Sequence, residues 1–77
     1  MKTVFITQEP VELFKLLKFE GLVGSGGEAK FVVSQGLVKL NGEVERQKRK
    51  KVLAGDIVEF NDQLMSIVLQ ASTWNPF

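Results

Sequence analysis

Five cationic side chains fall within six consecutive residues in the second half of the chain. They are Arg46, Lys48, Arg49, Lys50 and Lys51, and no acidic residue interrupts them. The whole chain of 77 residues has a formal net charge of +1, so the remaining positions carry five cations against nine acids. Because clustered like charges repel one another, an anionic partner explains the run better than solubility alone. A polyanion would relieve the repulsion and gain entropy by releasing its counterions.

Both alternating sets of positions in this run contain lysine or arginine, so neither set can face a core. We therefore expect an extended loop or a hairpin arm, and the candidate partners are a nucleic acid, an anionic membrane or an acidic protein. The run lacks interleaved aromatic residues, which argues against stacking on single-stranded bases. Neither predicted helix is basic enough to suit a DNA major groove. Recognition of phosphates and shape in a structured RNA is therefore favoured over DNA.

Residues for catalysis are scarce. The chain has no histidine, cysteine or tyrosine, which removes the usual bases, nucleophiles and soft metal ligands. Ser25 has no neighbouring base and suits a helix cap, while Glu43 and Glu45 flank a turn where acids are usually solvated. We therefore predict a protein that is not an enzyme and needs no cofactor or metal. No stretch approaches the roughly 18 apolar residues of a membrane span. The predicted partner is a nucleic acid and not a membrane.

A strand and a helix are predicted before residue 22. Residues 3–7 are β-branched and apolar, as in a short strand. Pro10 suits the first turn of a helix over residues 11–19, in which leucines three and four positions apart share one face. Gly21 is a natural stop for this helix.

A second helix is predicted to begin with a capping box, in which Ser25 and Glu28 satisfy each other's free backbone amides. It ends at Gly36. The glycines at its start, Gly26 and Gly27 among them, would let a phosphate approach the helix amides. They would equally permit a tight turn between the helices, which is the simpler explanation.

From residue 37 the apolar pattern changes to period two, and Asn41-Gly42 predicts a hairpin. A two-residue turn would place Val44 opposite Lys39, whereas a longer turn would place it opposite Leu40. We therefore expect a bulged or longer turn. Two further strands, over residues 57–60 and 64–69, complete an α+β fold in which a two-helix pair packs on a small, mostly antiparallel sheet. Five aromatic residues are expected in its core: Phe5, Phe14, Phe19, Phe31 and Phe60.

Several of these features together resemble a known family. The motifs are Ser25-x-x-Glu28-Ala29, a helix end at Gly36, Val38-x-Leu40-Asn41-Gly42, and Gly55-Asp56-x-Val58. They are similar to the RNA-binding domain named after ribosomal protein S-four, the alpha-L motif, over about residues 11–60. Short stand-alone bacterial members look especially similar, since GGEAKF, VKLNGEVE and a basic stretch before the Gly-Asp turn occur together in them. The resemblance implies a helix pair on a small sheet and binding of structured RNA, typically ribosomal.

The resemblance also implies an RNA-facing surface made by the helix pair, the hairpin and the loop after it. Carried over by position, this surface would include Lys15, Lys18, Ser25, Gly26, Gly27, Lys30, Lys39, Asn41, Arg46, Lys48, Arg49, Lys50 and Lys51. Many members of the family have arginine at the position of Gly26, so that contact is absent here or is made by backbone amides. Asn41 is explained more simply by the turn than by a base contact.

We therefore predict a single RNA-binding domain over residues 1–77, with a core motif over about 11–60 and a C-terminal strand and tail over 61–77. It would be a cytoplasmic protein that recognises structured RNA, ribosomal RNA first of all, with DNA less favoured. The alternative is a protein–protein adaptor whose basic arm docks on an acidic partner. Trp74 and Phe77 would then be its anchors.

Overall fold

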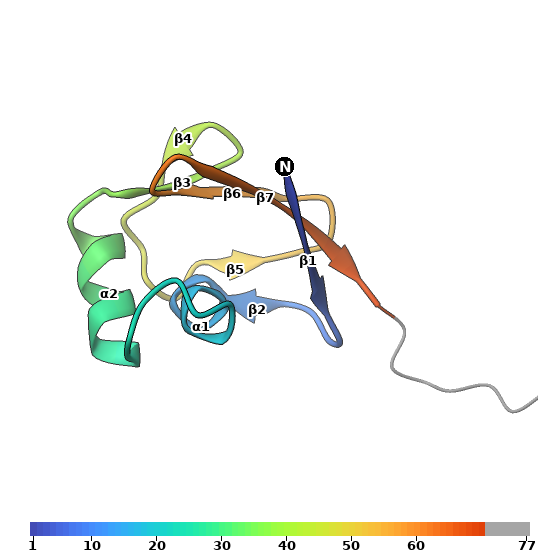
Figure 1. Ribbon diagram of the computed structural model, residues 1–77, viewed down its shortest axis with the longest axis horizontal. Coiled ribbons are helices and arrows are strands. Elements are labelled where there is room, and N and C mark those ends of the chain that lie inside the picture. Colours follow the sequence, from blue (N-terminus) through green and yellow to red (C-terminus); the bar gives the residue numbers. More distant parts are fainter. Residues whose placement is uncertain (71–77) are drawn as a thin grey trace, which may run out of the picture.

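Seven strands and two helices lie along residues 1–70, the part of the chain that the computed structural model describes. They are β1 (Lys2–Ile6), β2 (Val11–Glu12), α1 (Leu13–Phe19), α2 (Gly26–Ser34), β3 (Val38–Leu40), β4 (Glu43–Val44), β5 (Lys51–Val52), β6 (Ile57–Phe60) and β7 (Gln63–Leu69). Five strands form one sheet in the order β1-β7-β6-β3-β4, while β2 and β5 form a separate antiparallel pair. Within the five-stranded sheet β1 and β7 are parallel and the other pairs are antiparallel. The predicted α+β fold is confirmed (Figure 1).

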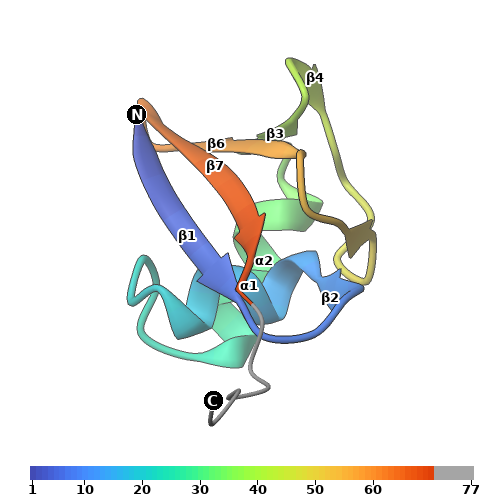
Figure 2. The same ribbon diagram turned by 90° about the vertical axis from the view of Figure 1, so that its right-hand side faces the viewer.

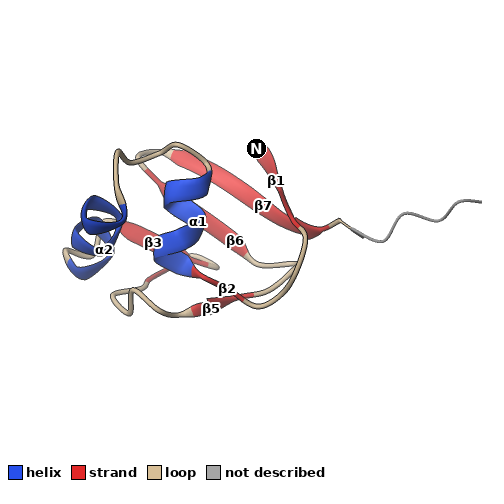
Figure 3. Cartoon of the chain, turned by 90° about the horizontal axis from the view of Figure 1, so that it is seen from below, coloured by secondary structure: helices blue, strands red, loops and turns tan. Residues whose placement is uncertain are grey.

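Both helices pack on one face of the five-stranded sheet, as Figures 2 and 3 show. Alternate residues of β1 and β7 point toward them and are buried, namely Val4, Ile6, Met65 and Ile67. Leucines of α1 and the small side chains of α2 fill the space opposite. No element among residues 1–70 covers the other face of the sheet, which we call the outer face. This two-layer arrangement decides which side chains can reach a ligand on the helix side.

Helix α1 is shorter than predicted, because residues 11 and 12 form a strand instead of its first turn. Val11 pairs with Val52 and Glu12 with Lys51, so β5 holds these residues in extended conformation. Pro10 therefore precedes a strand and does not lie in a helical turn. The predicted stop is confirmed, since the chain turns at Gly21, where φ is +70°.

The predicted cap of α2 is half right. The Ser25 hydroxyl accepts a hydrogen bond from the Glu28 amide at 3.1 Å. The Glu28 carboxylate reaches one residue further back than expected and accepts from the Gly24 amide at 2.8 Å. At the other end Gly36 has φ of +77°, which confirms the predicted helix end.

The expected bulge in the Asn41-Gly42 hairpin is wrong. Lys39 lies opposite Val44 and Leu40 opposite Glu43, so the turn has two residues. Asn41 and Gly42 both have positive φ, +54° and +86°, as a type I′ turn requires. The chemistry of the turn sets the register here, and Val44 remains exposed as a consequence.

Three of the five phenylalanines expected in the core are exposed. Phe14 is buried and Phe60 is partly buried, but Phe5, Phe19 and Phe31 are 58%, 69% and 59% exposed. Aliphatic side chains fill the single layer between helices and sheet. A side chain on the outer face of a strand or helix then has nothing to pack against, whatever its hydrophobicity.

Candidate nucleic-acid interface

The backbone of residues 46–51, which we call the basic segment, holds the start of α1. The Leu13 amide donates a hydrogen bond to the Lys50 carbonyl at 2.9 Å, and the Phe14 amide donates to the Lys48 carbonyl at 3.0 Å. The first amides of a helix lack partners within the helix, and the residue before α1 supplies no side-chain cap. The basic segment therefore acts as the cap of α1 and is fixed in position by it.

The side chains of the basic segment remain available to a ligand. All five of its lysine and arginine residues are exposed. The ion pairs found among residues 1–70 join Lys2 to Glu20 and Lys15 to Glu12, each at 3.3 Å, and neither involves the basic segment. No carboxylate among residues 1–70 forms an ion pair with its side chains. A fixed backbone with uncompensated cations suits phosphate binding, because little loop entropy is lost on association.

Two lysines of the helix pair gather beside the start of α1. The Lys30 ammonium of α2 lies 4.9 Å from the centroid of the Phe14 ring, and the Lys15 ammonium of α1 lies 6.0 Å from it. The Phe14 amide is itself bound to the basic segment. Lys18 is exposed and follows Lys15 by three residues, so the two share one side of α1. The structure therefore brings Lys15 and Lys30 together at the start of α1, next to the basic segment, and Lys18 lies one turn further along α1. We call these three lysines and the basic segment the basic surface.

Arg46 extends the basic surface to the end of α2. Its guanidinium lies against Gly36, so closely that a Cβ at that position would stand 2.5 Å from Nη1 of Arg46. The C-terminal end of a helix favours a positive charge because its carbonyl dipoles point there. Gly36 thus has two roles: it allows the positive φ, and it leaves room for Arg46.

Glu45 accepts a hydrogen bond from the Gln47 amide at 3.0 Å, so its carboxylate lies at the basic segment. A second acidic residue, Glu12, lies within the basic surface. It is half-buried, pairs across the β2–β5 ladder with Lys51, and forms the ion pair with Lys15. The sequence predicted Glu12 to be a helical residue and gave no sign that β5 would approach it. Its carboxylate reduces the positive potential that a phosphate would meet.

Side chains of the protein itself already bind two backbone amides at the glycine-rich start of α2. The Ser25 hydroxyl is bound to the Glu28 amide, and the carboxylate of Glu28 lies beside the Gly24 amide. A carboxylate at this helix start disfavours a phosphate by charge repulsion. The contact favours the tight-turn explanation for Gly26 and Gly27.

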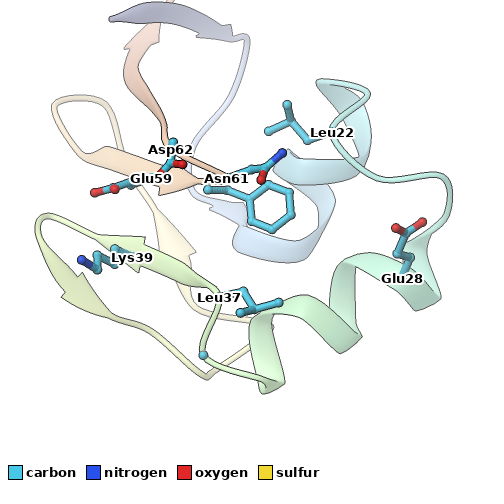
Figure 4. Close-up of a pocket in the computed structure, with 9 residues that line it drawn as sticks. Leu22, Glu28, Leu37, Lys39, Glu59, Asn61 and Asp62 are labelled. Carbon is cyan, nitrogen blue, oxygen red and sulfur yellow. The ribbon is translucent and has the colours of Figure 1, made fainter.

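Lys39 lies apart from the basic surface. It points to the outer face of the sheet, between Glu59 on β6 and Val44 on β4. It also lines a pocket of about 600 Å³ whose other charged residues are acidic. Figure 4 shows Lys39 and Glu59 at one end of this pocket and Glu28 at the other. Lys39 therefore stands among acidic side chains, and its predicted contact with RNA stays a prediction.

Asn41 is committed to the scaffold. Its Oδ1 accepts a hydrogen bond from the Ile57 amide at 2.8 Å, and its Nδ2 donates to Asp56 at 3.1 Å. Both ends of the amide are thus used within the fold. The structure places Asn41 as a link between two turns.

Other expected features fall outside this surface. Trp74 and Phe77, the anchors of the adaptor alternative, lie outside the described residues. Among residues 1–70 no group of three or more potential ligands is arranged to hold a metal ion. The same residues contain no helix with the length and apolar character needed to traverse a bilayer.

A helix pair on one face of a small mixed sheet is the architecture of the alpha-L RNA-binding motif. The family model of the S4 domain matches residues 4–68, and the chain belongs to this family. The S4 domain is an RNA-binding domain and not an enzyme family. The predicted resemblance is therefore confirmed.

Individual relatives are similar along most of their length. The protein named "Putative RNA-binding protein YbcJ" of Escherichia coli (strain K12) is 42% identical over 69 residues, which cover 88% of this chain and 99% of that protein. "Probable ribosome maturation protein RlbA" of Bacillus subtilis (strain 168) is 34% identical over 56 residues, or 73% of this chain and 79% of that protein. The solution structure of YbcJ from E. coli, described as revealing an alfaL motif involved in RNA-binding, superposes with a TM-score of 0.67. That match covers 88% of this chain and 87% of the other.

Proposed function

We propose that this protein binds structured RNA through the basic surface, without catalysing a reaction. The observation that carries the proposal is the arrangement of the basic segment. Its carbonyls cap α1, whereas its lysine and arginine side chains are exposed and form no ion pair within residues 1–70. The fold thus uses the backbone of this segment and leaves its charge to a partner.

The basic surface suits the phosphates of a folded RNA. Lysines from both helices flank the basic segment, so cations lie on more than one element and can contact more than one stretch of backbone. Such a surface reads shape and phosphate spacing, which differ between an RNA helix and a DNA helix. We infer that about four to six phosphates are contacted, and that most of the affinity is electrostatic.

Ribosomal RNA is the first target to test. The relative RlbA is named as a ribosome maturation protein, and the resemblance to the ribosomal S4 family points the same way. A ribosomal target would place the protein in the cytoplasm. We propose that residues 1–77 form a single RNA-binding domain, and that its contacts with RNA lie between α1 and β5.

Ultraviolet crosslinking to a ribosomal RNA hairpin, followed by mass spectrometry of the crosslinked peptides, tests the location of the site. We expect crosslinks in the basic segment and in the peptides that contain Lys15, Lys18 and Lys30. A DNA hairpin of the same sequence should compete poorly. Crosslinks confined to the outer face, around Lys39 and Val44, would contradict the proposed site. Sequencing of RNA crosslinked in cells would then identify the natural target.

A further inference from the structure

Phe31 is an exposed aromatic residue on the helix that bears Lys30. Its side chain is 59% exposed, whereas Ala29, Val32 and Val33 on the other side of α2 are buried. Leaving a phenylalanine in water forgoes the favourable free energy that its burial would contribute. A partner that covers the ring would recover this free energy.

The surroundings of Phe31 leave its ring accessible. Along α2 the neighbours on the same side are Gly27 and Glu28 before it, and Ser34 and Gln35 after it. The Ser34 hydroxyl donates a hydrogen bond to the Phe31 carbonyl at 2.8 Å and so lies close to the helix. Gly27 and Ser34 are small and leave room for a flat group along one side of the ring.

Phe31 borders the basic surface. The residue before it, Lys30, places its ammonium 4.9 Å from the Phe14 ring, beside the start of α1. Glu28 lies three residues before Phe31 and is acidic, but its carboxylate is held by the Gly24 amide. A nucleic acid whose phosphates contact Lys30 therefore has a base within reach of the Phe31 ring.

We propose that Phe31 stacks on an unpaired base of the RNA bound at the basic surface. This inference rests on the proposed function and specifies the ligand further: a structured RNA with a nucleotide bulged out of its stem. A base stacked on an aromatic ring needs one open ring face and a nearby cation for the adjoining phosphate. A protein anchor would instead sit within a wider apolar patch, and the exposed neighbours of Phe31 on α2 are small or polar.

Phe31→Leu tests the proposal, because leucine remains apolar but has no aromatic face. Phe5→Leu is the matched control, since Phe5 is 58% exposed and lies on β1 at the outer face. Each variant is titrated with two RNA hairpins of equal length, one fully paired in its stem and one with a single bulged nucleotide. Phe31→Trp serves as the conservative variant that retains stacking.

We expect Phe31→Leu to weaken binding of the bulged hairpin about five- to hundredfold, the effect of losing one base–aromatic stack. Its affinity for the fully paired hairpin and the salt dependence of binding should stay unchanged, since stacking releases no counterions. Phe5→Leu should affect neither RNA, and Phe31→Trp should bind the bulged hairpin as the natural chain does.

Two results of these titrations would overturn the proposal and leave the proposed function standing. One is an unchanged affinity of Phe31→Leu for the bulged hairpin; the other is an equal loss for both hairpins. The proposal would also be overturned if Phe31→Leu weakened the binding of a protein partner and left RNA affinity unchanged. Phe31 would then be assigned to a protein contact. If the natural chain binds neither hairpin, the proposed function fails together with this inference.

Discussion

Asn41 joins the two turns on which the family resemblance depends. Its side chain contacts Asp56 and the Ile57 amide, and the other carboxylate oxygen of Asp56 accepts from the Leu53 amide at 2.9 Å. The Asn-Gly and Gly-Asp turns are thus one hydrogen-bonded unit. The sequence predicted each turn from local chemistry, but the contact spans about 15 residues and no local pattern announces it.

Asn41→Ala should destabilise the fold more than Asn61→Ala does. Both asparagines have positive φ, +54° and +57°, so alanine is strained equally at the two positions. Of these two asparagines, only Asn41 forms side-chain hydrogen bonds within residues 1–70. Losing its two bonds should lower the free energy of unfolding by about 1–3 kcal/mol. Urea denaturation of the two variants measures the difference in the free energy of unfolding. Equal losses would show that the Asn41 side chain contributes nothing.

The carboxylate of Glu12 lowers the net positive charge of the basic surface. Replacing it by glutamine removes a carboxylate beside Lys15 and Lys51 while keeping the size of the side chain. We expect Glu12→Gln to tighten RNA binding by up to about fivefold, the scale of one partly exposed ion pair. Glu59→Gln on the outer face is the control and should leave the affinity unchanged. Weaker binding by Glu12→Gln would mean that the acid orients Lys15 for contact.

At the scale of elements, sequence patterns predicted most helices and strands and failed where a distant segment intervened. The cap and end of α2 follow from Ser25 and Gly36, which act within a few residues. The start of α1 does not follow from its own residues, because β5 and the basic segment hold it from almost 40 positions away. For the same reason the sequence predicted the basic segment as a loop but not its role as a helix cap.

Ser25→Ala should lower the free energy of unfolding by about 0.5–2 kcal/mol, the usual cost of a lost helix cap. Ser34→Ala, at the other end of α2, removes only an exposed hydrogen bond to the Phe31 carbonyl and should cost less. Thermal denaturation of the two variants measures both losses of stability. RNA affinity of the folded Ser25→Ala protein should be unchanged if the hydroxyl serves only the cap. A large loss of affinity without a loss of stability would restore Ser25 to the interface.

At the scale of the whole molecule, one face of the sheet is covered by helices and the other is open. The sequence predicted the class of fold, because alternating patterns indicate strands whatever their order. It did not predict the parallel β1–β7 pair, which joins the two ends of the described chain. It also placed Phe5, Phe19 and Phe31 in the core, since hydrophobicity alone cannot tell an inner face from an outer face.

The salt dependence of RNA affinity tests the central claim, that the basic segment neutralises phosphates. For the natural chain we expect log K to fall against log salt with a slope of about −3 to −5. Arg49→Ala/Lys50→Ala/Lys51→Ala should flatten this slope by about two to three units, because each lost phosphate contact releases about one counterion fewer. Its thermal stability should be retained, since alanine keeps the carbonyl that caps α1.

The control is Lys2→Ala/Lys39→Ala, which removes the two lysines that lie outside the basic surface and should leave the slope unchanged. A flattened slope for the triple variant alone is the result that the account predicts. An undiminished slope for the folded triple variant, or an equal change in the control, would contradict it.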